Sequence, residues 1–139
     1  MSGDLHLIKL CVGCDTVDEL IAWRQTALPR GDPWILRTRQ TPRRAAELTA
    51  GGSLFRVYRG VILSRQAILA VNTVGAGPEA RCEITLNETV VLTSPTPRRA
   101  FQGWRYLVGQ EAPRDLADGS GADAIPPELS RRLLEAGVW

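Results

Sequence analysis

The stretch from residue 54 to residue 93 constrains the fold of this chain more than any other part of the sequence. It contains four apolar or alternating segments typical of β-strands, at 54–59, 61–74, 80–86 and 89–93. Turn-forming residues separate these segments, namely Gly60, the Gly-Ala-Gly-Pro run at 75–78, and Asn87-Glu88. Short strands joined by tight turns predict a mostly antiparallel sheet, in which Gly60 makes a bulge or tight bend.

The residues before this stretch predict two more strands and two short helices. Residues 5–12 predict a strand that is largely buried. Asp15 or Thr16 then caps a helix that runs to about residue 28. A second strand follows at 34–39, and a short helix at 41–49 ends at Gly51-Gly52. The predicted fold class is therefore α+β, a small, mostly antiparallel β-barrel with short flanking helices.

The 139 residues have the length of one ordinary domain, and we expect a single domain over 1–139. Its hydrophobic share of 44% and charged share of 23% are close to globular averages, which argues against general disorder. A Gly-, Asp- and Ser-rich stretch near 117–125 predicts a flexible linker, and residues 127–136 predict a C-terminal helix.

The pentapeptide Thr-Pro-Arg-Arg-Ala occurs twice, at 41–45 and 96–100. Thr as the N-cap and Pro in the first turn predict the start of a helix at each copy, the second one being a helix or helical turn that contains Phe101 and Trp104 and could extend to Leu107. The paired arginines then stand where the helix dipole is already positive, which a bound anion would reconcile. The alternative is a solvated surface, with the arginines in water or paired with carboxylates such as Glu47.

Basic residues cluster although the formal net charge is only +2. Residues 30–65 contain eight arginines against two acids, and the arginine fork matches phosphate well. Together with the strand at 34–39, the two repeats predict an arginine-rich cleft that binds nucleic acid or another anion. Its predicted members are Arg37, Arg39, Arg43, Arg44, Arg98 and Arg99.

Aromatic side chains close to these arginines could stack on bases, a combination that favours single-stranded or flipped nucleotides. The candidates are Trp34, Trp104 and Tyr106. The alternative is that they fill the core, since Trp and Tyr bury large areas.

Cys11-Val12-Gly13-Cys14 is a C-x-x-C motif, which can be a redox pair or half of a zinc site. His6 and Cys82 could complete four ligands, but His6 and Cys11 should lie on opposite faces of one strand. There is no second C-x-x-C motif. We therefore predict no metal and no cofactor, and interpret these cysteines as small buried thiols, with Gly13 making a turn.

The N-terminus lacks the pattern of a secretion signal, and no apolar segment is long enough to cross a bilayer. The three cysteines, an odd number, do not resemble a disulfide framework. The sequence predicts a cytoplasmic protein that has no membrane partner.

Two segments, His6–Asp15 and Arg98–Leu107, resemble the signature ends of a small bacterial family of unknown function. They read His-Leu-Ile-Lys-Leu-Cys-Val-Gly-Cys-Asp and Arg-Arg-Ala-Phe-Gln-Gly-Trp-Arg-Tyr-Leu. This resemblance covers nearly the whole chain and implies no known activity.

A looser resemblance concerns the middle third of the chain. Residues 48–58 (Leu-Thr-Ala-Gly-Gly-Ser-Leu-Phe-Arg-Val-Tyr), followed by 60–62 and 70–71, are similar to the helix, Gly-Asp turn and aromatic-ended strand of PUA-like barrels, including the ASCH and EVE branches. Here Gly52-Ser53 stands where Gly-Asp is usual. The resemblance implies binding of RNA or modified bases, which is common in that superfamily.

Binding of RNA or of another nucleotide-containing anion is therefore the predicted function, and we do not expect catalysis. An alternative is a small amidohydrolase-like enzyme for a modified nucleoside, since some ASCH members use Lys, Thr and Glu. This chain offers Thr38 without a neighbouring lysine, and its only lysine, Lys9, could pair with Glu83 as an acid and base. A further alternative is an interaction module whose arginines dock an acidic protein.

Overall fold

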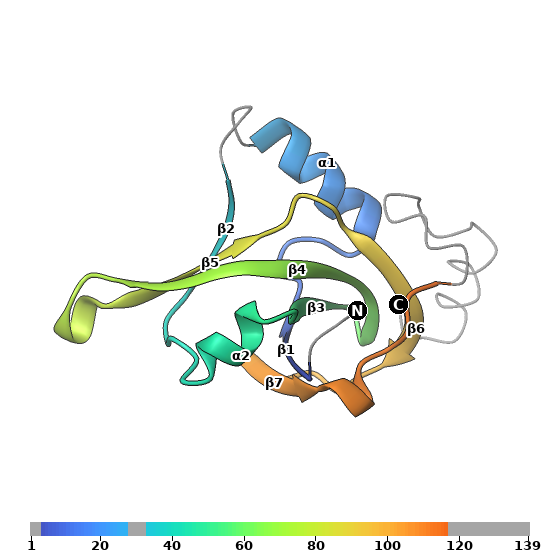
Figure 1. Ribbon diagram of the computed structural model, residues 1–139. Helices are drawn as coiled ribbons and strands as arrows, with labels where there is room; N and C mark the ends of the chain where they lie inside the picture. Colours follow the sequence, from blue (N-terminus) through green and yellow to red (C-terminus); the bar gives the residue numbers. More distant parts are fainter. Residues whose placement is uncertain (1–3, 28–32, 117–139) are drawn as a thin grey trace.

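The computed structural model describes residues 4–27 and 33–116 (Figure 1). The linker and the C-terminal helix expected at 117–125 and 127–136 lie outside the described residues. The elements are, in chain order, β1 (Leu5–Leu10), α1 (Val17–Ala27), β2 (Trp34–Thr38), α2 (Ala45–Thr49), β3 (Ser53–Tyr58), β4 (Val61–Val74), the 3-10 turn η1 (Gly77–Glu79), β5 (Arg81–Leu86), β6 (Val91–Pro97), β7 (Trp104–Val108) and the 3-10 turn η2 (Gly109–Glu111).

The seven strands form one strongly curved sheet in the order β2-β5-β4-β3-β1-β7, with β6 also paired to β4. Its long strand β4 pairs with β3 and β6 along its first half and with β5 along its second half, where the two strands extend as an arm (Figure 1). Only β1 and β3 run parallel. The α+β class and the mostly antiparallel sheet are confirmed, but β2 and β7 do not pair in the described ranges, so a closed barrel is not.

Hydrophobic residues fill both faces of the central strands. On β1, Leu5 and Leu7 join the larger core, whereas Ile8 joins a smaller core on the other face with Phe55 and Leu107. The larger core also receives buried residues from both helices. Burial on two faces explains why β1 is apolar at successive positions instead of alternating with polar residues.

Helix α1 begins where the sequence predicts. The Thr16 hydroxyl accepts a hydrogen bond from the Glu19 backbone N–H at 3.1 Å, and the Glu19 carboxylate accepts one from the Asp15 backbone N–H at 2.6 Å. These two bonds satisfy N–H groups that have no partner within the helix. No helix in the described ranges is long and apolar enough to cross a membrane.

The helix start predicted at the first Thr-Pro-Arg-Arg-Ala copy is wrong by several residues. Helix α2 begins at Ala45, and Arg44 occupies its N-cap position without a capping side chain. The Thr41 hydroxyl is instead hydrogen-bonded to the Thr73 hydroxyl at 2.7 Å. A contact between segments far apart in sequence has therefore displaced the local cap.

The helix predicted at the second copy is also wrong. Thr96 and Pro97 end β6, and the Arg98 N–H donates to the Gly60 carbonyl at 2.8 Å. Gly103 has φ +68°, a left-handed conformation that breaks a helix, and β7 then pairs with β1. Burial of Leu107 in the smaller core stabilises the strand.

Arg59 and Gly60 form the two-residue turn between β3 and β4, with φ angles of +49° and +89°. Two successive positive φ angles are typical of a type I′ turn, for which Asn-Gly is the preferred pair. The tight bend expected at Gly60 is confirmed. Arg59 is the only non-glycine residue with positive φ in the described ranges.

We expect Arg59→Asn to raise the free energy of unfolding by about 0.5–1 kcal/mol, because Asn adopts the left-handed conformation more readily than Arg. The change also removes an exposed 3.7 Å contact with Asp15, which contributes little. Thermal denaturation followed by circular dichroism should show a rise of about 2–4 °C in Tm. A lower Tm would show that this contact outweighs the relief of backbone strain.

Candidate functional site

Two of the six predicted anion-binding arginines are paired with carboxylates. Arg37 of β2 lies 3.1 Å from the Glu83 carboxylate of β5, directly across the strand pair. Arg44 lies 2.6 Å from the Glu47 carboxylate one turn along, and the hydrogen bonds from Arg44 lower the pKa of Glu47. Each of these two guanidiniums therefore has a carboxylate partner, in an ion pair that lies at the surface.

The other four predicted arginines make no side-chain hydrogen bond or ion pair within residues 4–27 and 33–116. Arg39, Arg43 and Arg99 are exposed, and Arg98 is half-buried. The first Thr-Pro-Arg-Arg-Ala repeat is hydrogen-bonded to Tyr106 of β7. The second repeat is hydrogen-bonded to Gly60, in the turn between β3 and β4. Within the described ranges, no hydrogen bond or ion pair joins the two repeats.

The predicted stacking residues on β7 hold the first repeat in place. The Trp104 indole N–H donates to the Gln40 carbonyl at 3.2 Å, and the Tyr106 hydroxyl accepts from the Arg44 backbone N–H at 3.1 Å. The Arg44 guanidinium also lies over the Tyr106 ring, 5.7 Å from its centroid. Both aromatic side chains therefore have a structural role.

A cavity that the sequence analysis did not predict lies where β1, α1, β2 and β3 meet. It has a volume of about 310 Å³. We call it the Arg56 pocket. Its lining includes Lys9, the Cys11–Cys14 loop, Leu20 and Trp23 of α1, Trp34 and Leu36 of β2, and Arg56 of β3.

Arg56 is the most unusual residue of this pocket. It is only 7% exposed, and its Nε and Nη2 both donate to Gln66 Oε1, at 3.2 and 3.0 Å. Its guanidinium lies over the Trp34 ring, 5.7 Å from the centroid. No carboxylate in the described ranges pairs with it, although a buried charge is costly unless it is compensated.

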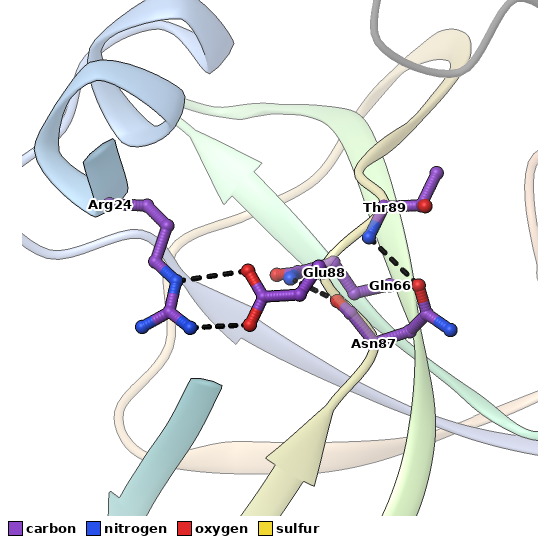
Figure 2. Close-up of polar contacts among 5 residues, drawn as sticks. All are labelled: Arg24, Gln66, Asn87, Glu88 and Thr89. Carbon is purple, nitrogen blue, oxygen red and sulfur yellow. Dashed lines mark hydrogen bonds and ion pairs between the residues drawn. The ribbon is translucent and has the colours of Figure 1, made fainter. Parts of the chain in front are cut away.

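The loop formed by Asn87 and Glu88 binds Gln66 and Arg24 (Figure 2). Gln66 Nε2 donates to the Asn87 carbonyl at 2.9 Å. This bond fixes the orientation of the Gln66 amide, whose oxygen accepts the hydrogen bonds from Arg56. The Glu88 carboxylate accepts from Nε and Nη2 of Arg24. The Arg24 guanidinium also lies over the Trp34 ring, 5.1 Å from its centroid. Two guanidiniums therefore contact the ring of Trp34, which is 4% exposed, so this candidate stacker supports arginines instead.

We expect Glu88→Gln to lower the free energy of unfolding by only about 0.5–1 kcal/mol, because the Glu88 side chain of this pair is 58% exposed. The loss should shrink at high salt, where exposed charges are screened. Urea denaturation at low and high salt measures both effects, with the exposed Glu79→Gln as a control. A salt-independent loss above about 2 kcal/mol would contradict this account of the pair.

The cysteines of the C-x-x-C motif form part of the pocket wall. Gly13 has φ +87° and makes the turn between them, as predicted. Burial raises the pKa of the Cys11 thiol to about 12, and nearby Arg56 opposes this rise. The thiol is thus protonated at neutral pH and is a poor nucleophile.

The third cysteine and the histidine lie elsewhere. Cys82 is buried on β5, and the His6 Nδ1 accepts from the Ser53 backbone N–H at 3.0 Å. In the part of the chain that the structure describes, no three His, Cys, Asp or Glu residues are grouped to hold a metal ion. The groups considered for hydrolysis have other partners. The Glu83 carboxylate accepts from Arg37, and the Thr38 hydroxyl donates to the Gln40 carbonyl at 3.0 Å.

A second, larger cavity of about 830 Å³ lies between the start of β3 and residues 109–115. Its Arg65 is paired with Asp115 at 2.7 Å, and the hydrogen bond from Arg65 lowers the pKa of Asp115. The charge of Arg65 is therefore paired with a carboxylate, whereas Arg56 has no carboxylate partner among the described residues.

Comparison with known protein families confirms the resemblance that the segments His6–Asp15 and Arg98–Leu107 suggested. The family described as Protein of unknown function (DUF1489) matches residues 7–139. The chain belongs to this family. No curated protein and no solved structure matches it. The description of DUF1489 states no activity, so the function of this DUF1489 protein has to be argued from its own side chains.

The Arg56 pocket of this DUF1489 protein was missed because its members are dispersed along the chain. One signal was present: Arg56 interrupts an otherwise apolar, strand-like run, between Leu54 and Tyr58 on the same face. A charged residue within such a run must either reach solvent or find a partner in the interior. The identity of the partner, Gln66, depends on the pairing of β3 with β4.

Proposed function

We propose that this DUF1489 protein binds a nucleotide-containing anion, either RNA or a free modified nucleotide, at the Arg56 pocket. One observation carries the proposal: the guanidinium of Arg56 is buried at a pocket wall and is compensated by an amide oxygen and an aromatic ring, but by no carboxylate of residues 4–27 and 33–116. A cation held in this way favours a ligand that brings negative charge or strong hydrogen-bond acceptors.

The remaining pocket wall suits a planar ring. Leu20 and Leu36 give apolar contacts, and the volume of about 310 Å³ is at the lower end of the range for small-molecule sites. Trp23 is 46% exposed and Val12 is 82% exposed, so both offer apolar surface at the pocket. Stacking of a base on an exposed Trp is worth about 1–3 kcal/mol.

The exposed arginines extend the proposal from a nucleotide to a polynucleotide. No carboxylate in the described ranges pairs with the exposed Arg39, Arg43 and Arg99 or with the half-buried Arg98, so all four can neutralise phosphates. Arg37 and Arg44 are already paired, and we assign them a smaller part.

The proposal includes a PUA-like relationship for the fold. It is supported by the succession of α2, the glycines at 51 and 52, and a β3 strand that ends at Tyr58 and turns directly into β4. Gly52 lies close against the end of α2, because a Cβ at this position would meet the Leu48 carbonyl at 2.6 Å.

Fluorescence-anisotropy titrations with single-stranded RNA, single-stranded DNA and duplex at two salt concentrations test this function. We expect single strands to bind better than duplex, with an affinity that falls as salt rises. Arg39→Ala/Arg43→Ala should weaken binding and reduce the salt slope, whereas Arg81→Ala, an exposed arginine on β5, should not. Absence of binding to every nucleic acid, together with capture of an acidic protein, would replace the proposal by the interaction-module alternative.

A further inference from the structure

We propose that the Arg56 pocket selects guanine. This inference rests on the proposed function and specifies the base that enters the pocket. It follows from the hydrogen bonds of Gln66, which occupy one edge of the Arg56 guanidinium and leave the donors of the other edge for a ligand.

A guanidinium carries five N–H donors in a fixed planar fork. Gln66 Oε1 accepts from Nε and Nη2, which share one edge of the group. The second edge, formed by Nη1 and the remaining Nη2 hydrogen, meets no hydrogen-bond acceptor oxygen among the described residues. The Cys11 thiol interacts with the guanidinium through a side-chain hydrogen bond, but sulfur is only a weak acceptor that a ligand oxygen or nitrogen can displace. Two parallel donors of a buried cation are thus available to a ligand.

Among the bases, guanine matches this edge best. Its O6 and N7 are adjacent acceptors, and arginine binds them in a bidentate manner. Adenine presents an amino group beside N7, so a donor would face the cation. A cytosine amino group is likewise a donor.

The apolar walls favour insertion of the ring over insertion of the phosphate. Leu20, Trp23 and Leu36 can exclude water around a base, and the two leucines offer no donor to phosphate oxygens. Lys9, which is half-buried in the same lining, has no ion pair in the described ranges and is our candidate for the phosphate. In such a complex, Arg56 binds the base and Lys9 binds the phosphate.

Isothermal titration calorimetry of the full chain with GMP, IMP, AMP and 7-deaza-GMP tests the inference. IMP keeps O6 and N7, AMP replaces O6 by an amino group, and 7-deaza-GMP lacks N7. We expect GMP and IMP to bind with similar affinity, and both to bind at least about 10-fold more tightly than AMP and 7-deaza-GMP. Equal affinity for GMP and AMP would overturn guanine selection while leaving nucleotide binding intact. Absence of binding by all four would overturn guanine selection, and absence of binding to single-stranded RNA as well would overturn the proposed function.

Arg56→Lys separates the shape of the donor edge from its charge. Lysine keeps the positive charge but lacks the planar pair of donors. In a variant whose Tm is close to that of the natural protein, we expect the preference for GMP over AMP to fall to about 2-fold or less, as for loss of a bidentate contact. An unchanged preference would overturn the inference. The nucleotide series on the natural protein gives the answer by itself if the variant does not fold.

Discussion

Replacing Arg56 with Met is expected to remove nucleotide binding and to leave the fold as stable as before. The side chain is 7% exposed and has no carboxylate partner in the described ranges, so its desolvation is only partly compensated. Methionine fills a similar space without a charge. We expect affinity for GMP to fall at least about 100-fold, the equivalent of two charge-assisted hydrogen bonds. The free energy of unfolding should change by no more than about 2 kcal/mol, because relief of the buried charge offsets the loss of the two hydrogen bonds to Gln66 Oε1.

Calorimetry and urea denaturation measure these two effects on the same sample. Arg81→Met is the matched control, because it makes the same chemical change at an exposed position away from the pocket. A loss of more than about 2 kcal/mol in Arg56→Met would show that the arginine stabilises the core, against our account. Retained affinity would show that the ligand does not use the guanidinium.

Replacing Gln66 with Leu is expected to be strongly destabilising. Gln66 is fully buried, its oxygen accepts both hydrogen bonds from Arg56, and its amide donates to the Asn87 carbonyl. Leucine would leave a buried cation and a backbone carbonyl without these partners. We expect the free energy of unfolding to fall by about 2–4 kcal/mol, measured by urea denaturation.

The double variant Arg56→Met/Gln66→Leu shows whether the cost comes from the uncompensated charge. We expect it to be more stable than Gln66→Leu alone by at least about 1 kcal/mol, since the cation is no longer present. Gln102→Leu, at an exposed position, controls for the change of side chain. Strictly additive effects of the two substitutions would contradict the coupling between Arg56 and Gln66.

Features that depend on neighbouring residues could be predicted from the sequence. The start of α1 follows from Thr16, whose hydroxyl accepts a hydrogen bond from the Glu19 N–H within one turn. The apolar pattern of β1 and the tight turn at Gly60 likewise reflect local residues. These features need no knowledge of which strands lie side by side.

The two repeats show where local signals fail. Each copy has the residues of a helix start, but Thr41 contacts Thr73, and β7 gains pairing with β1 and a buried Leu107. Tertiary contacts of this kind outweigh a cap worth about 1 kcal/mol. The sequence alone does not reveal them, because the partners are far apart in the chain.

The candidate site failed to appear in the sequence for a related reason. Clustering of arginines suggested free cations, but Arg37 meets Glu83 only because β2 pairs with β5. Arg56, outside the predicted set, becomes distinctive only when its burial and its contact with Gln66 are known. The partner of each charge, more than the number of charges, determines which arginine is available to a ligand.

The most direct test of the Arg56 pocket is a ¹H–¹⁵N NMR titration with GMP that follows the arginine Nε–H and tryptophan indole N–H signals. Single substitutions assign the signals of Arg56, Trp23 and Trp104. We expect the largest shifts at Arg56 and Trp23, which line the pocket, and little change at Trp104, which holds the first repeat. Shifts confined to Trp104 and the exposed arginines, with Arg56 unaffected, would contradict binding at this pocket.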